Sequence, residues 1–109
     1  MNERQVYVHR AELQLRPEDD PRAPGGAVTT ALCGHWEHEP PCRWPHHNSE
    51  PTGTGDTPFR TVFVAAPEDE SEVRQRIEIA LRSGPWVVLS TQADKADEDE
   101  AALGLRLNK

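Results

Sequence analysis

Hydrophobic and polar residues alternate along the first part of the chain and predict a β-strand there. Between Gln5 and Leu15 the odd positions are mostly apolar, while the even positions from 10 to 14 are charged or carry an amide. A period of two places one set of side chains on each face of a sheet, so we expect a half-buried strand. His9 lies on the apolar face, where a hydrogen-bonded core histidine is a more frequent finding than a metal ligand.

Three further apolar runs predict strands. Residues 28–32 (VTTAL) and 59–65 (FRTVFVA) are rich in β-branched and aromatic residues, and residues 86–89 (WVVL) form a run that is typical of a short buried strand. Trp86, at the start of this last run, is expected to close the core. Residues 16–26 contain three prolines and two glycines and therefore favour a loop.

One helix is predicted between the last two strands. Four apolar residues recur with helical spacing between positions 73 and 81, and the sequence SGP at 83–85 ends the pattern. Asp69 and Glu72 fit a capping box at the start of this helix. A strand, a helix and a strand in succession form a right-handed crossover, which makes the two strands parallel. The apolar stripe comprises Val73, Ile77, Ala80 and Leu81.

The order of elements is therefore β-β-loop-β-α-β, which predicts an α+β fold with a small mixed sheet of about four strands and one helix packed on one face. Residues 39–58 are rich in proline and are expected to be irregular, so they need some other source of order. We expect residues 1–93 to form one domain. The acidic residues 94–109 are interpreted as a solvated tail or as a short terminal helix that buries Leu103 and Leu105.

Composition and charge exclude several classes of partner. The chain has 109 residues, a hydrophobic share of 35% and a mean hydropathy of −0.78, so its core is expected to be thin. The net charge of −7 is spread almost evenly and leaves no basic patch for phosphates, so we expect neither nucleic acid nor an anionic membrane as a partner. The N-terminus lacks the apolar stretch of a signal peptide, which favours a cytoplasmic protein.

The residues that carry chemistry are concentrated in one short segment. Residues 33–47 read CGHWEHEPPCRWPHH and contain both cysteines and four of the five histidines of the chain. Thiolate and imidazole are the ligands that Zn²⁺ prefers, and four of them in a tetrahedron form a closed structural site. The sequence thus predicts a metal-ordered Cys/His loop, with zinc as the first choice of ion and nickel or copper as alternatives.

Six side chains are candidate ligands of this ion. Two pairs, each with the internal spacing of a zinc finger, flank a turn of two prolines, and two further histidines are alternatives. The span between the two pairs is shorter than in the common zinc fingers. The paired candidates are Cys33, His38, Cys42 and His46, and the alternatives are His35 and His47.

Two interpretations without a metal remain open. A disulfide between Cys33 and Cys42 would close a small loop, although the lack of a recognisable secretory segment and the surplus of histidines argue against it. Alternatively, the two cysteines are free thiols in a polar loop, since cysteine often serves as a small buried hydrophobic residue.

Two functions compete for a metal site of this kind. In the first, a non-catalytic protein uses the metal to order the loop, and Trp36, Arg43 and Trp44 present a surface to another protein. In the second, a small metalloenzyme or metal-handling protein keeps an open coordination position, and Glu37 or Glu39 acts as a general base toward metal-bound water. Two thiolates lower the Lewis acidity of the ion, and a short chain has little room for a substrate pocket, so the first function is favoured.

We predict that the purified, untagged protein carries about one equivalent of zinc per chain, because the candidate ligands suffice for one closed site. Elemental analysis of protein prepared without a metal-affinity step measures the metal content. A protein that contains no transition metal, and whose two thiols both react with a thiol reagent, would contradict the metal site.

Overall fold

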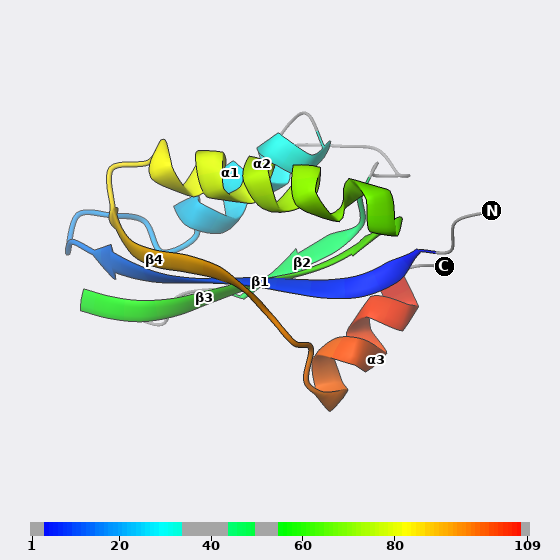
Figure 1. The fold of residues 1–109 in the computed structure, drawn as a ribbon. Helices are drawn as coiled ribbons and strands as arrows, with labels where there is room; N and C mark the ends of the chain where they lie inside the picture. Colours follow the sequence, from blue (N-terminus) through cyan, green and yellow to red (C-terminus); the bar gives the residue numbers. More distant parts are fainter. Residues whose placement is uncertain (1–3, 34–43, 50–54, 108–109) are drawn as a thin grey trace.

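A computed structural model describes residues 4–33, 44–49 and 55–107 of the chain. Within these ranges, four strands form one open sheet and three α-helices lie against its two faces (Figure 1). The elements follow one another as β1 (Gln5–Leu15), α1 (Ala23–Cys33), β2 (His46–Asn48), β3 (Gly55–Ala65), a 3₁₀ turn (Pro67–Asp69), α2 (Glu70–Arg82), β4 (Val87–Asp94) and α3 (Glu98–Leu107). The predicted α+β class is confirmed, but α1 was not expected, and α3 was expected only as one of two alternatives.

The strands lie in the order β2-β3-β1-β4, and each strand runs antiparallel to its neighbours. The expected mixed sheet is therefore wrong. Strands β3 and β4 do run parallel to each other, as the crossover predicted, but β1 is inserted between them. At the other side of the sheet, β3 lies between β1 and β2. This strand order and the succession of elements are those of the β-α-β-β-α-β topology of ferredoxin-like folds, with α3 added at the end.

Helix α1 replaces the strand that was predicted at residues 28–32. The β-branched residues of this run favoured a strand, but Pro24, Val28 and Leu32 lie four residues apart and all three are buried. The proline is tolerated because it lies in the first turn, where its missing N–H would have no partner within the helix. Burial of this stripe thus outweighs the weak helix propensity of the segment.

The core lies between the sheet and helices α1 and α2, which cover the same face (Figure 1). Helix α2 contributes the predicted stripe, of which Val73, Ile77 and Leu81 are fully buried. The helix ends at Arg82, as the sequence predicted. Asp69 does occupy the N-cap position, but its side chain forms no capping hydrogen bond, so the expected capping box is absent there.

Strand β4 and the region 39–58 also differ from expectation. Strand β4 is an edge strand, not the buried strand predicted at 86–89, and Val87 and Leu89 are 48% and 49% exposed. Only Trp86, just before β4, is buried, as expected for a residue that closes the core. The region 39–58 is not irregular throughout, because it contains β2 and the first residues of β3.

Helix α3 covers the opposite face of the sheet beside the start of β1 (Figure 1). The side chains of Val8, Val62 and Val64 lie on this face by strand alternation, and all three are buried. Gly104 allows the close approach of the helix, because a Cβ at this position would lie 2.4 Å from the methyl carbons of Val6. A second, smaller apolar layer therefore exists on the face that the sequence pattern of β1 assigned to solvent.

Arg60 anchors α3 to the sheet. Its Nε and Nη2 donate to the two carboxylate oxygens of Glu100 at 2.7 and 2.8 Å, and its Nη1 donates to Asp94 at 2.7 Å. These hydrogen bonds lower the pKa of both carboxyl groups. Asp97 and Glu100 also form a reciprocal capping box at the start of α3, at 2.7 and 3.0 Å. Of the two interpretations of the C-terminal residues, the short helix is the one observed.

We predict that deletion of residues 97–109 lowers the free energy of unfolding by more than about 3 kcal/mol, because it exposes three valines, each of which contributes about 1.5–3 kcal/mol when fully buried. Urea unfolding followed by circular dichroism measures this change. As a control, Leu105→Ser should change the free energy by less than about 0.5 kcal/mol, since Leu105 is 65% exposed and not buried as the sequence suggested. A truncated chain as stable as the full chain would contradict this role of α3.

Candidate functional site

The described part of the chain includes three of the six candidate metal ligands. Cys33 is the last residue of α1, and His46 and His47 are the first two residues of β2. The other three lie outside the described residues: His35, His38 and Cys42. Within residues 4–33, 44–49 and 55–107, no group of three or more metal-ligating side chains comes together.

Among the described residues, two hydrogen bonds orient the ring of His46. Its Nδ1 lies 3.0 Å from the carbonyl oxygen of Trp44, and its Nε2 lies 3.0 Å from Oγ1 of Thr29 in α1. A carbonyl group only accepts, so Nδ1 carries the proton, and Nε2 of the neutral ring directs its lone pair toward α1. Metal-binding histidines usually have this arrangement, because a backbone acceptor at one nitrogen fixes the ring and leaves the other nitrogen to the ion.

His46 and His47 lie on opposite faces of the sheet, as successive residues of a strand do. His46 is opposite Phe63 in the pairing of β2 with β3, on the face that α1 and α2 cover. His47 is opposite Val62 and lines a cavity of about 330 Å³ beneath α3. An ion on the α1 side of β2 is therefore within reach of His46 and not of His47.

The two ends of the Cys/His segment lie close together. Thr29 contacts His46, and α1 ends one helical turn beyond Thr29. Arg76 of α2 contacts both ends, because its Nη1 donates to the carbonyl oxygen of Ala31 at 3.3 Å and its guanidinium lies 5.0 Å from the centre of the Trp44 ring. The chain thus leaves α1 and returns to β2 at one place, where α1, α2 and β2 meet.

Trp44 is part of the core and not part of a partner-facing surface. Its side chain is 2% exposed and packs within the main hydrophobic cluster. The expectation that Trp36 and Trp44 together meet a partner is therefore wrong for Trp44, because the fold itself buries this indole. Trp36 lies outside the described residues.

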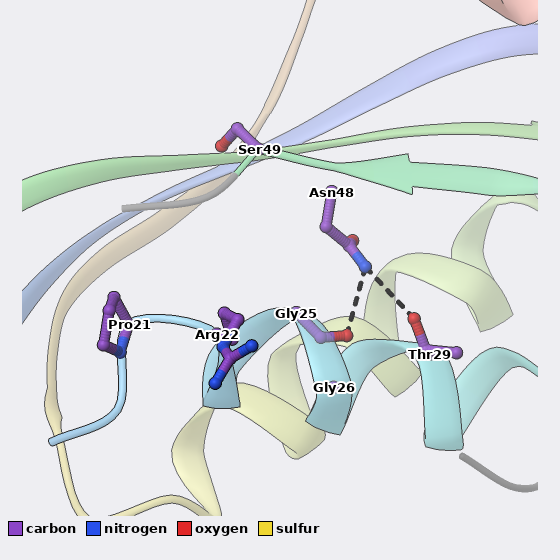
Figure 2. A pocket seen from close by; sticks show the side chains of 7 residues that line it. All are labelled: Pro21, Arg22, Gly25, Gly26, Thr29, Asn48 and Ser49. Carbon is purple, nitrogen blue, oxygen red and sulfur yellow. Dashed lines mark hydrogen bonds between the residues drawn. The ribbon is translucent and has the colours of Figure 1, made fainter. Parts of the chain in front are cut away.

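Asn48 connects α1 to the middle of the sheet. Its Nδ2 donates to the carbonyl oxygen of Gly25 at 3.1 Å and to Oγ1 of Thr29 at 3.3 Å (Figure 2). Its Oδ1 accepts a hydrogen bond at 2.7 Å from the hydroxyl of Thr61, which is fully buried. Sequence reasoning missed these residues, because Thr29 belongs to a segment that was expected to be a strand and no local pattern distinguishes Asn48 or Thr61.

An open pocket of about 220 Å³ lies beside this network, between the first half of α1 and the end of β2 (Figure 2). Gly25 lies at its wall, and a Cβ there would come within 3.4 Å of Cβ of Asn48. Just before α1, a carboxylate oxygen of Asp20 accepts a hydrogen bond from the amide of Arg22 at 2.9 Å.

Thr29 and His46 have the hydrogen-bond order of a nucleophile and its general base, but the surroundings do not complete a catalytic site. Thr29 lies in the interior of α1, where the backbone amides are engaged in the hydrogen bonds of the helix. Backbone donors for an oxyanion are therefore lacking at this position. We assign no reaction to this pair.

His9 lies on the same face of the sheet as His46, and it is buried. It is 5% exposed, and its Nδ1 accepts a hydrogen bond from Nη1 of Arg74 at 3.2 Å, whereas its Nε2 has no partner among the described residues. The predicted core histidine is confirmed, with one of its two nitrogens hydrogen-bonded. Burial, followed by the charge of Arg74, lowers the pKa of His9, and the charge of Glu78 opposes this change.

Comparisons with known proteins do not assign a function. No protein-family model matches the chain, and no curated protein and no solved structure matches it significantly. Among the helices of the described residues, none has the length and apolar character needed to cross a membrane. A fold of this topology hosts many unrelated functions, so the function has to be argued from the residues of the site.

We predict that the protein loses stability as the pH falls below about 6.5 and that His9 causes part of the loss. A histidine whose pKa is lower in the folded than in the unfolded state takes up a proton on unfolding, so its contribution is complete above the unfolded pKa of 6.5 and decreases as the pH falls toward the folded pKa. Urea unfolding of the wild type and of His9→Leu at several pH values measures the difference. The free energy of unfolding of the leucine variant should depend less steeply on pH than that of the wild type, by up to about 1.4 kcal/mol per pH unit. Identical slopes in the two proteins would exclude His9 as the cause.

Proposed function

We propose that this chain is a small non-catalytic metal-binding protein in which one ion, zinc in the first place, orders residues 33–47 as a surface for another protein. The observation that carries this proposal is the orientation of His46. Its Nδ1 is held by a backbone carbonyl, and its Nε2 directs a lone pair toward the helix that ends in Cys33. Nickel and copper accept the same ligand types and are the alternatives.

The ligand set that we propose draws on both ends of the segment and on its middle. Cys33 comes from the end of α1 and His46 from the start of β2, while His38 and Cys42 come from the residues between them. The contact between Thr29 and His46 supports this set, because it holds the start of β2 against the helix that ends in Cys33. The lone pair directed toward α1 favours His46 over His47 as a ligand, and His35 remains an alternative to His38.

A bound ion would also supply stability to a chain with little apolar material. Structural zinc contributes on the order of 10 kcal/mol of folding free energy, which is comparable to the whole stability of a small domain. The segment between α1 and β2 contains two adjacent prolines and several charged residues, and it has few apolar side chains to bury. Metal ligation is the source of order that such a composition requires.

The surface proposed for a protein partner is the segment itself. Trp36 and Arg43 are of residue types that are enriched in interface hot spots, whereas Trp44 serves the core. Binding of a partner should then depend on the metal, because the metal orders the segment. No feature of the described residues favours the metalloenzyme alternative.

The two histidines at the start of β2 provide the test. We predict that His46→Gln weakens zinc binding by more than about 100-fold, which is the upper range seen when a residue that merely orients a ligand is lost. The neighbouring variant His47→Gln is a matched control on the opposite face, and its zinc affinity should stay within about 3-fold of the wild type. Competition with a chromophoric chelator measures the affinities, and circular dichroism reports whether the variants are folded. Equal affinities in the two variants would contradict the role of His46, and a wild-type chain that takes up no zinc would contradict the function as a whole.

A further inference from the structure

The hydrogen bond between Thr29 and His46 uses the lone pair that a metal ion would need. Nε2 of His46 lies 3.0 Å from Oγ1 of Thr29, and the proton of the ring is committed at Nδ1 to the carbonyl oxygen of Trp44. The neutral ring therefore accepts at Nε2, and the hydroxyl of Thr29 donates. One lone pair serves either a hydroxyl proton or an ion, so the two are mutually exclusive.

The direction of the Thr29 hydroxyl is set by its other neighbour. Nδ2 of Asn48 donates to Oγ1 of Thr29 at 3.3 Å, so this contact uses an acceptor site of the hydroxyl and not its proton. Asn48 cannot turn its amide around without losing two further hydrogen bonds, one to the carbonyl oxygen of Gly25 and one from Thr61. Two side chains contact the hydroxyl of Thr29, namely Asn48 and His46. Because Asn48 donates to this hydroxyl, His46 is the one of the two to which the hydroxyl can donate.

The resulting chain of donors has one direction. Thr61 donates to Asn48, Asn48 to Thr29, Thr29 to His46, and His46 to the carbonyl group of Trp44. Hydrogen bonds arranged head to tail polarise and strengthen one another in a low-dielectric interior. Thr61 is fully buried and Asn48 and Thr29 are partly buried, so water competes weakly with these bonds.

We propose that Thr29, positioned by Asn48, acts as a latch on His46 and lowers the metal affinity of the site. This inference rests on the proposed function in one respect, namely that His46 is a ligand. In the metal-free protein the latch keeps β2 attached to α1, and the ion must displace the hydroxyl in order to bind. The latch thereby sets the zinc concentration at which the site fills.

The test compares two variants of Thr29 in the full chain. Thr29→Val has nearly the same shape but no hydroxyl, and it should bind zinc about 3- to 10-fold more tightly, which is the range that corresponds to one neutral hydrogen bond. Thr29→Ser keeps the hydroxyl and should stay within about 2-fold of the wild type. A merely structural role for Thr29 predicts the opposite sign, because a disturbed contact between α1 and β2 would weaken zinc binding in the valine variant.

A second measurement keeps the latch testable if the valine variant does not fold. Long-range ¹H–¹⁵N spectra of the metal-free wild type should show His46 with its proton on Nδ1 and a hydrogen-bonded, unprotonated Nε2, and zinc should shift the Nε2 resonance. A proton on Nε2 in the neutral ring would overturn the latch. Equal or weaker zinc affinity in Thr29→Val would overturn the latch alone, whereas a wild type that binds no zinc would overturn the proposed function as well.

Discussion

The side chain of Asn48 ties helix α1 to the sheet, and the geometry of the candidate site depends on this attachment. β2 has three residues, and on the α1 side it is held by the hydrogen bonds of Asn48 to Gly25 and Thr29. α1 and β2 lie close together here, since a Cβ at Gly25 would lie 3.4 Å from Cβ of Asn48. The position of His46, two residues earlier in the same strand, follows from the same attachment.

The two faces of the sheet have different roles, and the alternation of strand residues separates them. The face toward α1 and α2 holds the main core, the row of polar residues that includes Thr61, and the ring of His46. The other face holds a valine layer beneath α3, which Arg60 secures through bidentate contact with Glu100. Neighbouring histidines in β2 therefore belong to different environments, and only His46 faces the helix that ends in Cys33.

The proposed function combines a common topology with an uncommon segment. Nothing in the β-α-β-β-α-β arrangement indicates a metal, and folds of this kind serve many purposes. The indication comes from the density of cysteine and histidine between α1 and β2, together with the orientation of His46 by a backbone carbonyl. Because the hydroxyl of Thr29 lies 3.0 Å from Nε2 of His46, our proposal includes a neighbour that competes with the ion for this nitrogen.

The sequence by itself determined the elements whose pattern is long and regular. The limits of β1 and α2 were predicted within a residue or two. Each element buries one face against the main core, so its apolar residues recur with the period of a strand or of a helix. Tertiary contacts decided the rest. Residues 23–33 form a helix because Pro24, Val28 and Leu32 find partners in the core, and β2 is too short to carry a pattern of its own. The contacts of Thr29, Asn48 and His46 join residues far apart in the sequence, so only the tertiary structure determined which ring nitrogen of His46 faces α1.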